Sequence, residues 1–304
     1  MATGSTRARP AGNPASKLNP ASKLIDRAYR RFVHFPFDYT RVLDRIQQHV
    51  VPATYVEIGV ASGRTLSLAL PGTAAIGVDP HPKVRYPLSR GTRVFATTSD
   101  DFFAEHDLGA LLGERPVDLA FIDGMHLFEF ALRDFMNIER YSTATTAVLI
   151  HDCFPATAMT AERERQTEKG WTGDVWKLIL CLKHWRPDLR VAVVQVPPSG
   201  LGLVTGLDPS STVLADHYAE IVDHYVALPY SDIETTGKEQ ALNAVANDWD
   251  TVRAMLPERR RRDFSVSLHK SRRVLAETTR AARRRAGGLL GGARNAPVSR
   301  EDGA

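Results

Sequence analysis

Short runs of apolar residues recur along the middle of the chain, and each run ends in a polar or glycine-containing turn. Runs of roughly four to eight such residues between turns are typical of strands buried on both faces of a sheet. We expect such strands at residues 54–58, 74–79, 93–97, 118–122 and 146–151. Helical segments separate most of these runs, and that alternation predicts a parallel sheet covered by helices on both faces.

Helical periodicity appears between and around these runs. Helices are expected at residues 38–50, from about 62, and at 127–140, 173–185, 216–228 and 239–255. The first of them is amphipathic and would cover the sheet ahead of the first strand.

Residues 190–196 and 201–205 are two further apolar runs, separated only by Pro197-Pro198-Ser199-Gly200. Strands joined by so short a link must be antiparallel neighbours, because a parallel return needs a crossover of about a dozen or more residues. The expected fold class is therefore α/β, with a Rossmann-like, doubly wound sheet of seven strands. The sheet would be mostly parallel and would end in an antiparallel hairpin.

The first strand runs into a glycine turn with the sequence Val56-Glu57-Ile58-Gly59-Val60-Ala61-Ser62-Gly63. Glycine has no Cβ, so such a turn brings backbone N–H groups close to a ligand. A nicotinamide-binding turn would read G-x-G-x-x-G, whereas the spacing here is E-x-G-x-x-x-G. A side chain at Gly59 is expected to block a bound cofactor while the fold survives. An ordinary strand-to-helix turn is the plainer alternative.

Acidic residues follow the next strands as well. Asp79 ends the second strand, where a carboxylate suits the two hydroxyls of a ribose. Enzymes that bind dinucleotides share this feature, so Asp79 alone does not choose the cofactor. The fourth strand ends in F-I-D-G-M-H, with Asp123 and His126, and the fifth ends in His151-Asp152.

Together these motifs resemble class I S-adenosylmethionine (SAM)-dependent methyltransferases. The segment D-x-x-F-I-D-G-x-H, continued by Phe128 and Asp134, resembles a bacterial subgroup that includes small-molecule and sugar O-methyltransferases. The resemblance covers roughly residues 38–206 and implies a SAM site at the carboxyl edge of the sheet. The cofactor-binding residues that it implies are Glu57, Gly59, Ser62, Gly63, Asp79, Ser99 and Asp100. The last two would lie beside the adenine ring, or serve as a helix N-cap.

Asp123 and Asp152 are expected at the tips of adjacent strands. Two carboxylates there offer the hard oxygen ligands that Mg²⁺ prefers. Metal-dependent members of the resembled family use such a cation to lower the pKa of the acceptor oxygen. Those enzymes usually place Asn or Asp after the second acid, where this chain has Cys153. His126 or His151 would then supply the missing ligand.

The candidate catalytic residues are Asp123, His126, His151 and Asp152, and the candidate metal ligands are Asp123 and Asp152. An unperturbed imidazole titrates near pH ~6.5, so either histidine is also a candidate general base. The plainer alternatives are a strand-end residue bonded to backbone for His151 and a helix N-terminal residue for His126.

The segment after the fifth strand, residues 153–170, is polar and irregular, and we expect it to form a mobile lid over the acceptor. Trp171 and Trp176 follow it. They either flank an acceptor ring or pack as ordinary helix residues.

Composition narrows the class of protein. Of the 304 residues, 43% are hydrophobic, which is enough for a packed core, and no run approaches the roughly 20 apolar residues of a membrane span. Cys153 and Cys181 are the only cysteines. They indicate neither a disulfide framework nor a zinc site, so a reducing cytoplasm is expected.

The net charge of +4 is uneven, with arginine runs at 259–262 and 283–285. They predict a solvated helix or weak contact with an anionic membrane surface. No interleaved aromatic residues point to a specific nucleic-acid partner, and a homo-oligomer stays open. The expected limits are a disordered tail at 1–23, a methyltransferase domain at 24–206, a helical extension at 207–257 and a basic, partly disordered tail at 258–304.

The function expected from these features is cytoplasmic, SAM-dependent O-methylation of a small molecule, sugar or natural product, with Mg²⁺ as a candidate assistant. One alternative is a nicotinamide-dependent oxidoreductase on the same kind of fold, which the glycine spacing disfavours. A noncatalytic, membrane-associated module that acts through the basic C-terminal segment is another.

Overall fold

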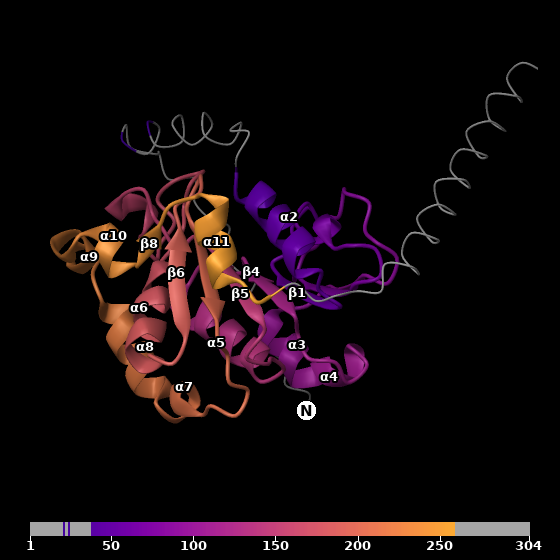
Figure 1. Cartoon of the computed structure of the whole chain (residues 1–304). Helices are drawn as coiled ribbons and strands as arrows, with labels where there is room; N and C mark the ends of the chain where they lie inside the picture. Colours follow the sequence, from indigo (N-terminus) through magenta and orange to yellow (C-terminus); the bar gives the residue numbers. More distant parts are fainter. Residues whose placement is uncertain (1–20, 22–23, 25–37, 259–304) are drawn as a thin grey trace, which may run out of the picture. The chain divides into compact units, whose positions relative to one another are not determined.

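The computed structural model describes residues 38–258, together with Ala21 and Leu24, and all of them fall in one compact unit (Figure 1). The tail expected at 1–23, apart from Ala21, and the arginine runs from Arg259 onward lie outside the described residues. Of the described helices, none is both long enough and apolar enough to cross a membrane.

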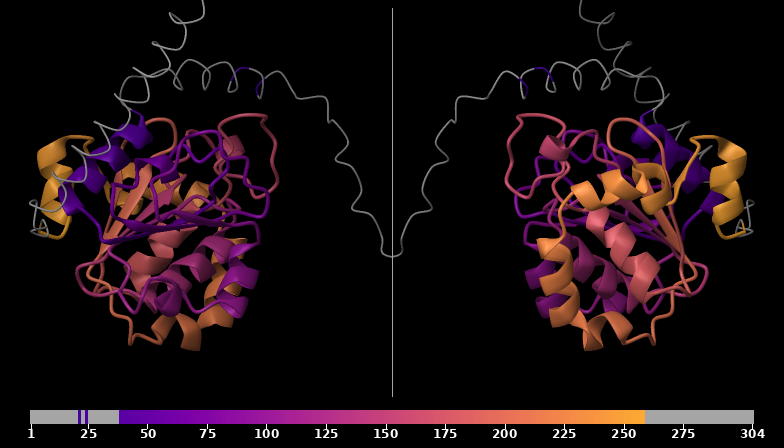
Figure 2. Two further views of the ribbon diagram at one scale, coloured as in Figure 1. Left: turned by 90° about the vertical axis from the view of Figure 1, so that its right-hand side faces the viewer. Right: turned by 90° about the vertical axis from the view of Figure 1, so that its left-hand side faces the viewer.

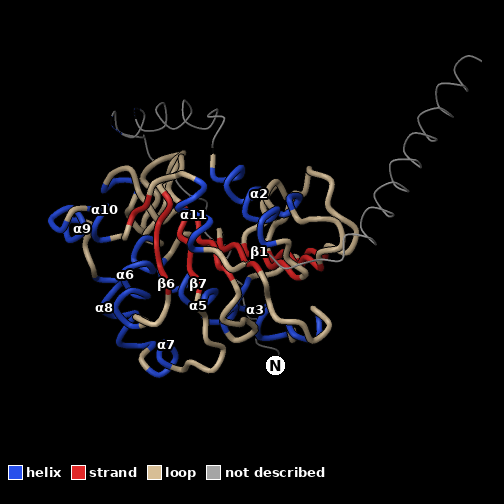
Figure 3. Tube along the Cα trace, in the orientation of Figure 1, coloured by secondary structure: helices blue, strands red, loops and turns tan. Residues whose placement is uncertain are grey.

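The strands form one sheet in the order β3-β2-β1-β4-β5-β7-β6-β8, which confirms the predicted doubly wound α/β class (Figures 1 and 3). The strands are β1 (Thr54–Ile58), β2 (Ala74–Val78), β3 (Arg93–Phe95), β4 (Leu119–Ile122), β5 (Ala147–His151), β6 (Arg190–Val194), β7 (Leu201–Thr205) and β8 (Ala244–Val245). Strand β7 runs antiparallel to both β5 and β6, as the short link predicted. The sheet has eight strands rather than the seven expected, because β8 pairs with β6.

Helices cover both faces of the sheet, as the views in Figure 2 show. On one face lie α2 (Tyr39–Val50), the 3₁₀ turn η1 (Leu66–Leu68) and α11 (Trp249–Met255). The other face is covered by α3 (Ser99–Glu105), α4 (Leu108–Leu111), α5 (Phe128–Glu139), α6 (Trp176–Trp185) and α8 (Tyr218–Ala227). The remaining helical elements are short: η2 (Ala158–Thr160), α7 (Val213–Asp216), α9 (Ser231–Thr236) and α10 (Lys238–Ala241).

Helix α2 illustrates how the sequence sets an element. Asp38 caps it by accepting a hydrogen bond from the backbone N–H of Arg41, and Leu43, Ile46 and Val50 bury one face against the sheet. Val51 ends it in the left-handed conformation. The amphipathic helix predicted at 38–50 is confirmed.

Two predicted helices were wrong. Instead of a helix from Ser62, the chain makes a turn with positive φ at Ala61 and Gly63 and then only the 3₁₀ turn η1. Instead of one helix over 239–255, Asn243 takes a positive φ and ends α10. Its side-chain amide donates to the main-chain oxygen of Val191, which holds the following residues at the sheet edge as β8.

Strand register brings the chemical motifs to one edge. Ile58 of β1 pairs with Ile122 of β4, and Ile122 pairs with Ile150 of β5. The residues directly after them are Gly59, Asp123 and His151. The carboxyl edge of the parallel strands therefore gathers the glycine turn and both acidic motifs, which is where ligands bind in open α/β sheets.

Candidate active site

Four side chains from the ends of β4 and β5 converge at this edge. The Nδ1 atom of His151 lies 3.2 Å from Oδ1 of Asp123 and 3.3 Å from Oδ2 of Asp152. His126 reaches the same two acids, with Nε2 3.4 Å from Asp123 Oδ1 and Nδ1 3.1 Å from Asp152 Oδ2. The structure thus brings together all four residues proposed as catalytic, and their role stays a prediction.

The backbone is bent to aim these side chains. His126 and Asp152 both have φ of 61°, in the left-handed region that non-glycine residues seldom adopt. The main-chain oxygen of His126 accepts a hydrogen bond from the N–H of Asp174 and would lie 1.8 Å from a Cβ on Gly173. The turn that carries His126 is therefore fixed from outside, as backbone strain at functional sites usually is.

The four charges stabilise one another. Burial alone would raise the pKa of Asp123, but the adjacent imidazoles outweigh it and hold that pKa below its usual range. Burial would likewise lower the pKa of His126, yet Asp152 and Asp123 raise it to about 9. Against the same opposing effect of burial, these two carboxylates also raise the pKa of His151. With its pKa raised to about 9, His126 therefore holds a proton at neutral pH.

The two histidines differ in their surroundings. His151 is 7% exposed, its ring lies 4.0 Å from that of Tyr39, and its Nε2 lies 3.4 Å from the hydroxyl of Ser199. The side chain of His126 is 26% exposed, and both histidines line a small cavity with Asp123 and Asp152. His126 is therefore the more accessible of the two histidines, and His151 is the more deeply buried.

Sequence reasoning missed Tyr39 and Ser199. Ser199 lies in the link between β6 and β7, and the antiparallel direction of β7 brings that link back to the tip of β5. The antiparallel hairpin was the available signal for it. Tyr39 offers no such signal, because its place depends on how α2 packs on the sheet.

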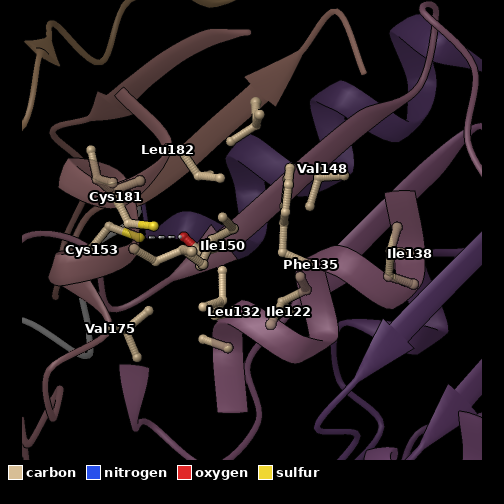
Figure 4. Packing of buried hydrophobic residues seen from close by; sticks show 14 of the residues in the cluster. Ile122, Leu132, Phe135, Ile138, Val148, Ile150, Cys153, Val175, Cys181 and Leu182 are labelled. Carbon is tan, nitrogen blue, oxygen red and sulfur yellow. Dashed lines mark hydrogen bonds between the residues drawn. The ribbon is translucent and has the colours of Figure 1, made fainter. Parts of the chain in front are cut away.

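The residues fit a divalent cation. Asp123, His126 and Asp152 each present one ligand atom within 4.8 Å of the others. Asp152 Oδ2 is buried and has no hydrogen-bond partner. Cys153, which follows the second acid, turns away: its thiol donates to the main-chain oxygen of Ile150, and burial raises its pKa (Figure 4). The poor ligand expected at this position is indeed directed into the core.

The glycine turn is held by Asp79. One carboxylate oxygen accepts the backbone N–H of Ala61 at 2.7 Å and the other accepts that of His81 at 2.6 Å. Asp79 is partly exposed, and its carboxylate oxygens have further lone pairs that could accept hydrogen bonds from a ribose. The cradle of this turn therefore fits a nucleoside cofactor.

Gly59 has a second reason for being glycine. Its φ is 90°, and a Cβ there would come within 1.9 Å of the main-chain oxygen of Asp123. The expectation that a side chain at Gly59 would spare the fold is therefore wrong, because β4 and not only a cofactor occupies the space. Gly63 also has positive φ, and the nearest atom to its missing Cβ is a methyl group of Val84 at 3.1 Å.

Glu57 is buried against the segment that follows the turn. It is 0% exposed and accepts hydrogen bonds from the hydroxyls of Tyr55 at 2.6 Å and Thr65 at 2.8 Å. Burial raises its pKa to about 8. In this structure Glu57 ties β1 to the segment after the turn, and direct contact with a cofactor stays a prediction.

The proposed adenine contacts lie at the start of α3. Thr98, not Ser99, caps the helix, accepting the backbone N–H of Asp101. Asp100 is held by two hydrogen bonds from Arg133, at 2.8 and 2.7 Å. Asp134 lies buried in the same region, where desolvation raises its pKa to about 7 and its Oδ1 has no hydrogen-bond partner.

The segment expected to form a lid borders the cluster. The ring of Trp171 stacks on that of His126 at 5.3 Å. Arg163 joins this segment to Glu129 of α5 and to the buried Asp174. Trp176 is 1% exposed and packs in the core, so of the two tryptophans only Trp171 borders the site.

Comparisons with known proteins agree with this arrangement at the level of class. Residues 56–153, which contain the glycine turn and both acidic tips, match the family model of a methyltransferase domain. No curated protein matches the chain in sequence.

Several solved structures are similar at low identity. The cofactor-bound protein Rv0187 from MTB is 14% identical, with 62% of this chain and 90% of that chain covered and a TM-score of 0.45. A putative O-methyltransferase from Klebsiella pneumoniae is 12% identical. The match covers 62% of this chain and 91% of that chain, with a TM-score of 0.43. The O-methyltransferase TomG from Streptomyces achromogenes, in complex with SAM, is 13% identical. The match covers 64% of this chain and 92% of that chain, with a TM-score of 0.43. Such TM-scores are too low to transfer a substrate or a residue role.

The strand order, the glycine turn and the family match together define the class. Residues 56–153 carry a methyltransferase domain, and the methyltransferase class predicted from the sequence is confirmed.

Proposed function

We propose that this enzyme transfers the methyl group of SAM to a hydroxyl of a small molecule or sugar. The observation that supports this most is the convergence of Asp123, His126, His151 and Asp152 next to the glycine turn. A hydroxyl is a weak nucleophile until its proton is withdrawn, so O-methylation needs proton-accepting or charge-stabilising groups beside the methyl donor.

The cofactor would be held by the turn at 59–63 and by Asp79, whose half-exposed carboxylate suits the ribose hydroxyls. Ser99 and Asp100 would lie on the adenine side. When bound, SAM supplies an electrophilic methyl group on a sulfonium. The chain's own contribution is to orient that group toward the acid cluster and to exclude water from it.

In the transfer, the acceptor oxygen forms a bond to the methyl carbon as the carbon–sulfur bond breaks. The electron pair of that bond stays on sulfur, so the products are a methyl ether and S-adenosylhomocysteine. The acceptor gives up its proton to the cluster or, through it, to solvent. A cation held by Asp123 and Asp152 would lower the pKa of the acceptor hydroxyl.

The acceptor would lie between the acid cluster and Trp171. Met125, 58% exposed, and the ring of Trp171 give this part of the site an apolar edge beside a charged floor. Such a surface suits a sugar or a ring-bearing natural product that presents one hydroxyl to the acids.

The test is transfer from SAM that carries a deuterated methyl group to a panel of hydroxylated sugars and phenols, each paired with its deoxy analogue. Tandem mass spectrometry locates the label. We expect it on oxygen, and we expect Asp123→Asn to slow transfer by roughly 10²-fold or more, as the loss of proton-withdrawing groups usually does. Label on nitrogen, or an Asp123→Asn enzyme of normal rate, would contradict the proposal.

A further inference from the structure

We infer that Asp123, His126 and Asp152 form a binding site for one divalent cation of the first transition series, such as Co²⁺ or Ni²⁺, and that this site prefers such ions to Mg²⁺. The inference rests on the proposed function, since it assigns how the cluster withdraws the acceptor's proton. His126 is then a ligand and not the general base.

The first argument is an unsatisfied atom. Oδ2 of Asp152 is buried, the side chain is 6% exposed, and no hydrogen bond reaches this oxygen. Two imidazoles lie beside this oxygen, but a buried carboxylate oxygen that accepts no hydrogen bond costs free energy, and native structures rarely leave one. His126 Nδ1 lies 3.1 Å away but donates to the main-chain oxygen of Trp171 at 3.2 Å, which leaves Nε2, 3.4 Å from Oδ1 of Asp123, as the ligand atom.

The second argument is the kind of donor. The mutually close set contains one imidazole nitrogen and two carboxylate oxygens. Mg²⁺ prefers oxygen ligands in near-ideal octahedral geometry, whereas imidazole suits zinc, copper, iron and nickel. The residue after the second acid does not supply a further oxygen ligand, because it is Cys153, whose thiol is turned into the core toward Ile150.

The third argument is the support behind the ligands. Nδ1 of His151 lies within 3.3 Å of both carboxylates, and its Nε2 lies 3.4 Å from the hydroxyl of Ser199. Outer partners of this kind orient metal-binding carboxylates and are part of most metal sites. His151 is therefore a positioning residue, held in turn by the ring of Tyr39.

The experiment uses the full chain, stripped of metal with a chelator. Calorimetry measures the affinity for Co²⁺, Ni²⁺ and Mg²⁺, and the visible absorption of Co²⁺ reports nitrogen ligation independently of turnover. We expect one ion per chain, bound at least about tenfold more tightly for Co²⁺ than for Mg²⁺. His126→Asn replaces the imidazole with an amide and should weaken Co²⁺ binding about 10–100-fold. The ratio of the Co²⁺ affinity to the Mg²⁺ affinity should fall as well.

Two control variants separate this site from other donors. His184→Asn removes an exposed histidine of α6, and Cys153→Ala removes the thiol next to the second acid; both should bind Co²⁺ like the parent. Equal affinity for Mg²⁺ and Co²⁺, or unchanged Co²⁺ binding in His126→Asn, would overturn the inference.

Binding of S-adenosylhomocysteine, measured on the same metal-free protein, keeps the two claims apart. Normal binding of this product with no binding of any cation would overturn the metal site and leave the methyltransferase proposal standing. Failure to bind the product would count against the proposed function itself.

Discussion

The main-chain oxygen of Asp123 occupies the space that a Cβ on Gly59 would need, at 1.9 Å from it. The turn that would cradle the cofactor and the strand tip that carries Asp123, a candidate catalytic acid, are thus packed directly against each other. Gly59 is glycine because of this contact as well as its φ of 90°. Donor and acceptor subsites share one rigid junction, which suits a reaction that depends on alignment.

This contact predicts that Gly59→Ala destabilises the fold. Gly72 is a matched control, because its φ is 87° and no atom lies within 4 Å of its missing Cβ. Gly72→Ala should cost about 1–2 kcal/mol for the left-handed conformation alone, and Gly59→Ala should cost clearly more in chemical denaturation. Equal losses of stability would show that the junction can relax.

Asp79 is predicted to bind the ribose of the cofactor. Asp79→Asn keeps one oxygen to accept the backbone N–H of Ala61 but removes the charge. Hydrogen bonds to a charged group contribute about 1.5–3 kcal/mol, so the affinity for S-adenosylhomocysteine should fall roughly 10–100-fold. Calorimetry measures it, with the melting temperature as the check on folding. An unchanged affinity in a folded variant would show that Asp79 does not bind the ribose.

The buried Glu57 predicts a stability that falls with pH. Its pKa is raised from 4.5 to about 8 in the folded protein by burial, so folding favours its protonated form. Its contribution is complete below about pH 4.5 and is lost as the pH rises to about 8, by up to a few kcal/mol. Glu57→Gln cannot ionise, so its free energy of unfolding in urea, relative to that of the parent, should increase as the pH rises from about 4.5 to about 8. Parallel curves for the two proteins would contradict this.

Arg163 is predicted to hold the segment that borders the cluster. It donates to Glu129 and to Asp174, whose side chain is 0% exposed. Arg163→Gln should break these links and speed amide hydrogen exchange through residues 157–172. Arg165 serves as the control, because its contacts stay within residues 157–172: it donates to the carbonyls of Thr167 and Glu168, and its guanidinium lies over the ring of Trp171. Arg165→Gln should change exchange less, and the reverse order would refute the assignment.

The sequence predicted most of the fold because periodicity and turn signals are local. The strands at 54–58 and 201–205 were predicted at their observed limits, and the convergence of Asp123 with Asp152 followed from strand-end position alone. The helix expected from Ser62 failed because the turn continues through positive φ at Gly63, which periodicity does not reveal.

The site was less predictable where it depends on side-chain direction. Glu57 lies near the end of the first strand in sequence, yet strand alternation puts it on the same face as Tyr55, where it is buried and bonded to Tyr55 and Thr65. Ser199 and Tyr39 reach His151 from segments distant in sequence, through the hairpin and through helix packing. Such contacts depend on tertiary packing, which a single sequence does not encode in any local pattern.

The most direct test of the central claim is calorimetric titration of the intact chain with S-adenosylhomocysteine, alongside NADH. The account predicts one site per chain for S-adenosylhomocysteine, with a dissociation constant of order 1–100 μM, about −5 to −8 kcal/mol, and no heat from NADH. Saturable binding of NADH with none of S-adenosylhomocysteine would contradict it.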